Sequence, residues 1–390
     1  MKTFKKIAAL AMALAVVLSL SACAGGGNDG YTAENTEYVI GFSGPLTGGA
    51  AVYGKGVQNG AQLAVDEINA NGGLNGIKFK LEAMDDQHDA TKVATNYANL
   101  LEKGMQVSLG TVTTRPGKEW TKLSVEDNVF FLTPSASGDD IPKEANGFQM
   151  CFADGNQGKV AAEFVNGTGL TKIGIFYKSD DPYSDGIYKQ FKENLNSSIA
   201  TVEAVFTGDA TDFTAQIATL KECTFVFMPI YYQPASIFMK QAKDIISKDA
   251  VYYGCDGFDG LAGQFEDFSI IPQEVSMLSH FDSNAKEGAA ADFIQKYTAK
   301  YGADTLNQFG ASAYDCVYAI YNAMKKAIDG GKEIPVTISA TDLCDILKGE
   351  FTGEFSYSGV TGNNITWEDN GYVSKEAVKY TLKVANSAAQ

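Results

Sequence analysis

Two loops rich in hydroxyl side chains follow apolar stretches that read as buried strands, at 107–109 and 129–132. Pro116 suits the first turn of a helix, so Thr114 or Arg115 is expected to cap that helix. Free backbone N–H groups, the helix dipole and nearby hydroxyls would together make a seat for a carboxylate, although ordinary helix capping explains the same residues. The candidate anion-binding residues are Thr113, Thr114, Arg115, Ser135, Ala136 and Ser137.

Asp256 is the acidic residue whose position is the most informative for chemistry. It follows the apolar run 251–253 and stands between small residues, where its carboxylate could face a cleft and pair with an ammonium group. A solvated aspartate in a turn is the alternative. Arg115 also has two interpretations, since it either adds a charged contact for a second carboxylate or points into solvent.

Neutral donors for a carboxylate, an acid for an ammonium and a shaped pocket are what a buried free amino acid requires. Aromatic residues on separate loops and at helix starts could form the wall of such a pocket, although surface or core positions would explain them as well. These aromatic candidates are Tyr53, Tyr183, Tyr231 and Phe309.

The elements that would position these residues begin with the stretch 38–86, which reads as strand, glycine-rich loop, long helix, turn and strand. Apolar residues recur at helical spacing from Ala61 to Ile68, and the helix pattern stops at Gly72. This βαβ unit requires a parallel sheet covered by helices, and its first loop faces the crevice where such sheets bind ligands. The loop matches neither G-x-G-x-x-G nor G-x-x-x-x-G-K-[ST], so it gives no support for nucleotide binding.

The alternation of strands and helices restarts after a crossover at 153–158 and returns to the first lobe near 280–281. The predicted fold class is therefore α/β, with two doubly wound parallel-sheet lobes joined by a three-segment hinge. The last crossover is expected near Phe351–Phe355, and Asn370-Gly371 is a strong signal for a two-residue turn. The predicted N-terminal lobe comprises 37–153 and 282–353, and the C-terminal lobe comprises 154–281 and 354–385.

The composition excludes several classes of function. The chain has 390 residues, is 45% hydrophobic and carries a net charge of −16, which argues against nucleic acid or an anionic membrane surface as a partner. Only two histidines occur, so a zinc centre or a histidine-based triad is poorly supplied. We accordingly expect no metal, no cofactor and no enzymatic activity.

The first 22 residues read as a secretory signal, with three lysines before an apolar run. The sequence Leu-Ser-Ala-Cys then ends at Cys23, and the glycine-rich segment 23–36 is predicted to be a flexible tether. The remaining cysteines are odd in number and form no C-x-x-C motif, which favours buried apolar residues; they are Cys151, Cys223, Cys255, Cys316 and Cys344.

The wording of residues 43–73, SGPLTGGAAVYGKGVQNGAQLAVDEINANGG, resembles the first segment of binding proteins for leucine-like amino acids, the solute receptors of ABC importers. The likeness runs through nearly all of the chain after the signal. It implies the type I periplasmic-binding-protein fold and the closing hairpin. Leu-Ser-Ala-Cys resembles the bacterial lipobox, which implies a lipid on Cys23 and an extracytoplasmic protein anchored to the membrane of a bacterium.

The same resemblance assigns roles to residues. It implies that the loops bearing Thr114, Ser135 and Ser137 hold the α-carboxylate of an amino acid, and that Asp256, where the family commonly has glutamate, pairs with its ammonium. It implies that the tyrosine of the Tyr-Ser-Asp-Gly loop at 183–186 reaches the ligand from the second lobe. The family's usual disulfide in the first lobe is missing, because His88 and Thr113 occupy the region of its cysteines.

The resulting hypothesis is a monomeric, lipid-anchored receptor that delivers an amino acid with a branched-chain or other apolar side chain to ABC permease subunits in the membrane. Closure of two lobes would join the half-sites, and the permease would recognise the closed form. The alternative is a sensory module of the same fold that binds an amino acid or a related small carboxylate.

Overall fold

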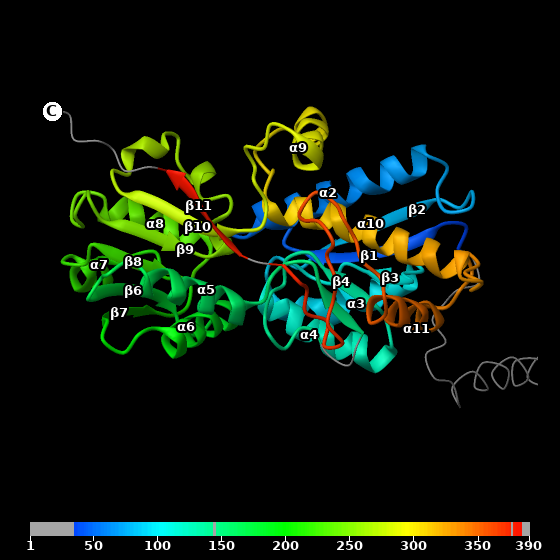
Figure 1. Cartoon of the computed structure of the whole chain (residues 1–390), viewed down its shortest axis with the longest axis horizontal. Coiled ribbons are helices and arrows are strands. Elements are labelled where there is room, and N and C mark those ends of the chain that lie inside the picture. The colour runs from blue at the N-terminus through cyan, green and yellow to red at the C-terminus, as the bar shows by residue number, and fades with distance from the viewer. Residues whose placement is uncertain (1–34, 143–145, 376, 384–390) are drawn as a thin grey trace, which may run out of the picture.

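The computed structural model describes residues 35–142, 146–375 and 377–383, and it shows two α/β lobes side by side (Figure 1). The predicted signal at 1–22, Cys23 and almost all of the tether lie outside the described residues. Each lobe is a mostly parallel sheet with helices against it, which is the predicted fold class.

The first lobe is built on a five-stranded parallel sheet with the order β2-β1-β3-β4-β5. Helices α2, α3, α4, α10 and α11 cover this sheet, and α10 packs along α2 (Figure 1). The strands are β1 (Tyr38–Gly44), β2 (Phe79–Asp85), β3 (Val107–Ser108), β4 (Phe131–Thr133) and β5 (Gly147–Gln149). The helices of this lobe are α2 (Ala51–Ala70), α3 (Val93–Glu102), α4 (Thr114–Asp127), α9 (Gly288–Tyr301), α10 (Gln308–Asp329) and α11 (Ala340–Phe351).

The second lobe is built on a six-stranded sheet with the order β11-β10-β9-β8-β6-β7. Its strands pair in parallel except for β11, which comes from the far end of the chain and pairs antiparallel with β10. The strands are β6 (Lys172–Lys178), β7 (Ala200–Phe206), β8 (Phe225–Met228), β9 (Val251–Gly254), β10 (Glu274–Ser279) and β11 (Val378–Lys383). The helices are α5 (Asp154–Asn166), α6 (Pro182–Asn194), α7 (Thr214–Leu220) and α8 (Tyr232–Ala242).

Helix α2 shows why the first βαβ unit forms as predicted. Ala61, Ala64 and Ile68 recur at helical spacing and are buried, which gives the helix one apolar face for the sheet and for α10. The helix ends before Gly72 and Gly73, which adopt φ of +97° and +70°, a conformation that glycine reaches without strain. The predicted strand–loop–helix–turn–strand order is confirmed.

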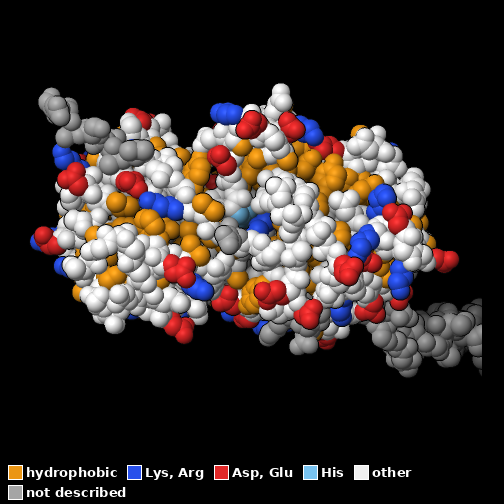
Figure 2. Space-filling view, in the orientation of Figure 1, with side chains coloured by type: hydrophobic (Ala, Val, Ile, Leu, Met, Phe, Trp, Pro, Cys, Tyr) orange, Lys and Arg blue, Asp and Glu red, His pale blue; other side chains and the backbone are white. Residues whose placement is uncertain are grey.

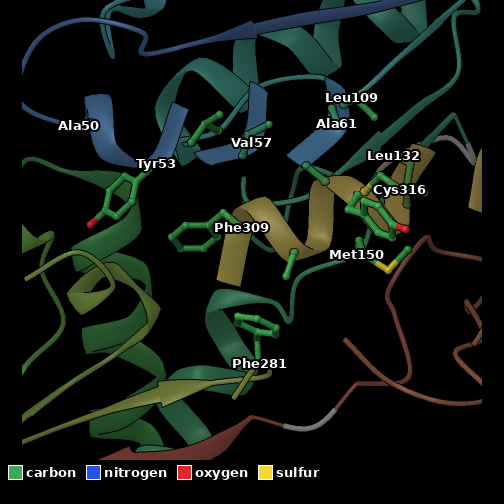
Figure 3. Close-up of a cluster of buried hydrophobic side chains, with 14 of the residues drawn as sticks. Ala50, Tyr53, Val57, Ala61, Leu109, Leu132, Met150, Phe281, Phe309 and Cys316 are labelled. Atoms are coloured by element: carbon green, nitrogen blue, oxygen red, sulfur yellow. The ribbon is translucent and has the colours of Figure 1, made fainter. Parts of the chain in front are cut away.

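The core of the first lobe extends along the contact between α2 and α10 as far as the edge of the second lobe. In Figure 3, Val57 and Ala61 on α2 lie near Phe309 and Cys316 on α10. All four side chains are buried. Tyr53 is drawn at the end of this cluster nearest the second lobe, so the same core that holds α2 and α10 together positions its aromatic ring.

The last segment of the chain differs from the sequence expectation. The indole Nε1 of Trp367 donates to the carbonyl of Gln149 at 2.7 Å, and the amide N of Gln149 donates to the carbonyl of Gly371 at 3.0 Å. The Trp367 ring also packs on Phe351 and Phe355. These contacts hold the hairpin against the first lobe, so the crossover expected near Phe351–Phe355 is wrong, and the chain enters the second sheet only at β11.

The hairpin itself forms as predicted. Antiparallel bridges join Tyr357 to Ile365 and Trp367 to Val373, and Gly371 adopts φ of +84° in the turn after Asn370. The five cysteines from Cys151 to Cys344 are buried free thiols, in agreement with the expectation of small apolar residues.

The visible surface carries acidic and basic side chains of both signs over both lobes (Figure 2). On this face the histidine colour is seen only in the furrow between the lobes, where the chain crosses from one sheet to the other. Among the described residues, no helix has the length and apolar character needed to cross a membrane.

Candidate functional site

The two lobes enclose a small cavity at the carboxyl ends of their parallel strands. Its volume is about 10 Å³, room for about one water molecule. Residues from both lobes form the wall: Tyr53, Val112, Thr113, Thr114, Ser135, Ser137, Tyr183, Tyr231, Asp256, Gly257 and Phe309. Nine of the eleven site residues predicted from the sequence are thus brought together, and an amino acid fits between them only when the lobes separate.

The first lobe contributes the hydroxyl loops. Thr113 precedes α4 as its N-cap residue, so the helix starts at Thr114, and the expected cap at Thr114 or Arg115 is one or two residues too late. The Thr113 hydroxyl makes no capping bond to the helix; it contacts His88 Nδ1 at 2.8 Å. After β4, the hydroxyl of Thr133 accepts a hydrogen bond from the amide of Ser135 at 3.3 Å, which fixes the second loop.

The aromatic residues form one connected cluster across the lobe boundary. Tyr231 stacks on Tyr183 with ring centroids 4.5 Å apart, and it lies 5.8 Å from the ring of Tyr53. Phe309 meets the Tyr53 ring edge-on at 5.1 Å. The Tyr53 hydroxyl donates to the carbonyl of Gly257 in the second lobe, so this cluster also joins the two lobes directly.

Asp256 lies at the end of β9 and its carboxylate is buried at the cavity. The Tyr183 hydroxyl donates to Asp256 Oδ1 at 2.7 Å, and the amide of Asp256 donates to Gln157 Oε1 at 3.0 Å. Burial raises the pKa of Asp256 to about 7, although the hydrogen bonds from Tyr183 and Gln157 act in the opposite direction. A solvated turn aspartate would be exposed, so the structure favours the cleft-facing interpretation.

This arrangement agrees with the comparisons to known proteins. The sequence model of the family described as "Periplasmic binding protein" matches residues 37–376. The chain belongs to this family. The resemblance noted in the sequence is therefore confirmed, and the two-lobed fold is that of a type I periplasmic binding protein.

Two relatives whose names state the amino acids that they bind are similar to this chain along most of its length. The Leu/Ile/Val-binding protein BraC3 of Rhizobium johnstonii is 29% identical over 330 residues, which span 78% of this chain and 86% of that protein. The leucine-, isoleucine-, valine-, threonine-, and alanine-binding protein of Pseudomonas aeruginosa is 26% identical over 308 residues, spanning 75% and 79% of the two chains.

Solved structures share the architecture. The branched-chain amino acid transporter substrate-binding protein LivJ from Streptococcus pneumoniae, in complex with isoleucine, is 27% identical with a TM-score of 0.74, and the match covers 88% of this chain and 100% of LivJ. The leucine-binding protein LivK of Thermotoga maritima supports the fold alone, at 20% identity and a TM-score of 0.76 over 90% and 96% of the two chains. These relatives are solute-binding proteins, and the family is extracytoplasmic.

Two residues predicted for the site lie outside the cavity of this periplasmic binding protein. Arg115 is exposed at the start of α4, and its guanidinium donates to the carbonyl of Asp180 across the cleft. The exposed position agrees with the solvent interpretation of the sequence, and the bond to Asp180 additionally joins the two lobes. Ala136 is buried in the core of the first lobe, and its amide is bonded to the Thr133 hydroxyl at 3.0 Å, so it has no free donor for a ligand.

Asp154 and Gln157 were missed by the sequence analysis. Asp154 begins α5 directly after the first crossover, and its Oδ2 lies 3.4 Å from the hydroxyl of Thr114. Gln157 Nε2 donates to Asp154 Oδ1 at 3.4 Å, and its Oε1 accepts from the backbone amide of Asp256, so one side-chain amide connects the Asp154 carboxylate to the backbone at Asp256. The sequence feature that could have identified these two residues is an acid followed three positions later by glutamine at the crossover. The same feature is also typical of an ordinary helix start.

A second, larger cavity of about 650 Å³ opens on the outer side of the aromatic cluster. Tyr231 lines both cavities, and His88 lies between them with its ring edge-on to Tyr231 at 5.5 Å. Burial, with the charges of Lys178 and Arg115, lowers the pKa of His88 to about 4, so the imidazole is neutral near pH 7. No group of three or more potential metal ligands was found in the described part of the chain.

Proposed function

We propose that this periplasmic binding protein is the solute receptor of an ABC importer and that it captures an amino acid with a branched-chain or other apolar side chain. The observation that carries the proposal is the pairing of half-sites from opposite lobes. The hydroxyl loops at Thr114, Ser135 and Ser137 face Asp256 across a cavity walled by aromatic rings. A zwitterion with an apolar side chain is the ligand that such a set of donors, acid and rings complements.

The small cavity implies how the ligand enters. About 10 Å³ is far below the volume of an amino acid, so the lobes must separate to admit the ligand and close over it. Contacts that then hold the closed form include the hydrogen bond of Tyr53 to Gly257 and that of Arg115 to Asp180. Closure thus builds the surface that permease subunits would recognise.

The relatives agree with the ligand class. LivJ, whose structure contains isoleucine, and the relatives named for leucine, isoleucine and valine are similar along most of this chain. We further propose a lipid anchor at Cys23 and a monomeric receptor; both rest on the sequence. Mass spectrometry of the membrane-extracted protein would test the anchor through the mass of the N-terminal peptide.

The proposal is tested by thermal unfolding of the purified protein without residues 1–23, in the presence of single amino acids, dicarboxylates, sugars and aromatic acids. A ligand at about a hundred times its dissociation constant stabilises the fold by roughly 2.7 kcal/mol. We expect leucine, isoleucine or valine to raise the unfolding temperature, and Asp256→Ala to abolish the rise. A shift only with sugars or with acids that lack an amine would contradict the proposed ligand class.

A further inference from the structure

The larger of the two cavities between the lobes takes no part in the proposed function. Its volume of about 650 Å³ falls within the range of roughly 300–1,000 Å³ that small-molecule sites occupy in proteins. Tyr231 lines both this outer cavity and the small cavity at Asp256, so the two are neighbours. Both lobes form the wall of the outer cavity, the first through Gln87, His88 and Arg115 and the second through Lys178, Phe206 and Tyr231.

Two cations, one from each lobe, line the outer cavity. Arg115 lies in the first turn of α4 in the first lobe, and Lys178 ends β6 in the second lobe. Burial, followed by the charges of Lys178 and Arg115, lowers the pKa of His88, which also lines this cavity. Both positive charges therefore act on one neutral imidazole, as expected of cations on the same part of the wall.

Neither cation has a close carboxylate partner among the described residues. The Arg115 guanidinium donates to the carbonyl of Asp180, which is a neutral oxygen. Lys178 Nζ lies 3.9 Å from Asp209 Oδ1, and the Asp209 side chain is fully exposed to solvent. A pair of this length and exposure contributes little. The Lys178 side chain is only 23% exposed, so its ammonium is partly removed from water without a strong partner in return.

The other acids near these cations are already engaged. Asp89 lines the outer cavity, but its Oδ1 accepts hydrogen bonds from the amide and the hydroxyl of Thr91 at 2.9 and 2.7 Å. Asp181 is buried and caps the start of α6. Burial raises the pKa of Asp181 to about 6, against the opposite effect of Lys178 and Arg115, so this acid is a weak counter-charge for them.

Closure of the lobes brings these two like charges together. Arg115 and Lys178 belong to different lobes, so they share one cavity only in the closed protein, and their charges then repel each other. An anion bound between them replaces this repulsion with two attractions. The planar guanidinium can bind two oxygens of a carboxylate or a phosphate side by side, and the ammonium adds a compact charge.

We propose that the outer cavity is a second binding site, for a small divalent oxyanion of the carboxylate or phosphate class, which Arg115 and Lys178 hold from opposite lobes. The bound anion favours the closed protein and so tightens the binding of an amino acid in the small cavity. This coupling rests on the proposed function, whereas binding of the anion itself does not. Because coupling between two sites is reciprocal, the amino acid tightens the binding of the anion by the same factor.

The test is isothermal titration calorimetry of the purified protein with leucine, in sodium chloride and in sodium succinate or sodium phosphate of the same ionic strength. Equal ionic strength keeps the screening of surface charges constant. We expect saturating succinate or phosphate to tighten leucine binding by about fivefold, which is the lower end of the usual coupling between two sites. Titration of the same anion into leucine-free and leucine-loaded protein should give the same factor.

Lys178→Gln removes one of the two cations and keeps a polar side chain. It should abolish the coupling and leave leucine binding in chloride unchanged or slightly tighter, because the repulsion on closure is gone. The matched control is Lys159→Gln, an exposed lysine of the same lobe whose distance to Glu163, 3.9 Å, equals that of Lys178 to Asp209. Lys159 does not line the outer cavity, so its replacement should keep the coupling. Arg115→Gln, which should also abolish the coupling, is the second route if Lys178→Gln does not fold.

The outcomes separate this inference from the proposed function. Competition of succinate or phosphate with leucine would assign the anion to the small cavity and overturn the inference, as would an equal effect of the anions on Lys178→Gln or no effect of either anion. An effect of one anion alone supports the site and identifies its class. Failure of leucine to bind would refute the proposed function, and titration of succinate and phosphate into the unaltered protein and into Lys178→Gln would still decide whether the outer cavity binds an anion.

Discussion

Replacement of Asp256 by asparagine should affect the empty and the loaded protein in opposite directions. Burial raises the pKa of this carboxyl from 3.8 to about 7 in the folded protein. A raised pKa means that the group's contribution to stability is complete below pH 3.8 and is lost as the pH rises through 7. At about 1.36 kcal/mol per pH unit, the raised pKa costs about 4 kcal/mol at pH 8.5, where the buried carboxylate is ionised. At pH 5 it costs about 1.5 kcal/mol, because the carboxyl then stays protonated in the folded protein and is ionised in the unfolded chain.

Asparagine removes this pH-dependent penalty and keeps an oxygen that can accept the hydrogen bond from Tyr183. About 2.1 cal/mol/K of unfolding entropy per residue over roughly 350 residues converts 4 kcal/mol to about 5 °C. This is an upper value, since opening of the lobes lets water reach the carboxylate. The same substitution removes the charge that pairs with the ligand's ammonium, so the stabilisation by leucine should disappear.

The assay is differential scanning calorimetry of Asp256→Asn and the unaltered protein at pH 5 and pH 8.5, with and without leucine. We expect the empty variant to unfold at a higher temperature at pH 8.5, with a smaller gain at pH 5, and to show no rise with leucine. Asp244→Asn is the charge-matched control, because that side chain is 79% exposed, and it should change neither quantity. A lower unfolding temperature of Asp256→Asn at pH 8.5, or a gain independent of pH, would refute the reasoning.

Three further substitutions test contacts around the cleft and the hinge. Thr113→Val removes the partner of His88 and should lower the free energy of unfolding by about 1 kcal/mol in a urea titration, with no loss if the 2.8 Å contact adds nothing. Arg115→Ala removes an exposed bond between the lobes, so stopped-flow fluorescence should show ligand release only a few times faster, and unchanged release would remove Arg115 from the closed form. Lys375→Met removes a buried ammonium that donates to the Met150 carbonyl at 2.7 Å and to the Thr361 hydroxyl at 2.5 Å. It should lower the free energy of unfolding by about 1–3 kcal/mol in the same urea titration because both acceptors lose their donor, and a stabilised variant would contradict this reasoning.

The site residues that could be predicted from the sequence lie at the ends of strands with a clear apolar pattern. Thr114, Ser135 and Asp256 each follow an apolar strand, and strand ends of parallel sheets meet at one edge, so their convergence follows from topology. The two-lobed fold was accessible for the same reason, because repeated βα units specify parallel sheets. The pattern of apolar residues along the chain thus indicates which residues lie at the same edge of a sheet.

The parts that were missed depend on contacts between distant segments. Asp154 reads in the sequence as an acid at a helix start, where the helix dipole favours it. Only the three-dimensional structure shows that this carboxylate is buried and faces Thr114, forty positions earlier in the chain. The hairpin near Trp367 was assigned to the wrong lobe because its aromatic residues pack on Phe351 and Phe355, and hydrophobic patterning does not identify the partner of an apolar side chain.

The contact between His88 Nδ1 and the Thr113 hydroxyl, at 2.8 Å, joins the loop after β2 to the start of α4. Gln87 and His88 both adopt left-handed backbone conformations, with φ of 56° and 63°, which costs about 1–3 kcal/mol for each residue. The backbone amide of Gln87 donates to the Asp85 carboxylate at 3.0 Å, and that of His88 donates to the Asp86 carboxylate at 2.9 Å. These hydrogen bonds offset the backbone strain.

The strength of this contact has a consequence for motion. A disulfide would hold the loop of His88 to Thr113 in every state of the protein, whereas a hydrogen bond of about 1 kcal/mol can break when its surroundings change. The His88 ring also packs edge-on against Tyr231 of the second lobe, so separation of the lobes removes one of its two supports. We therefore expect the strained loop of Gln87 and His88 to be better ordered with the lobes closed than with the lobes separated.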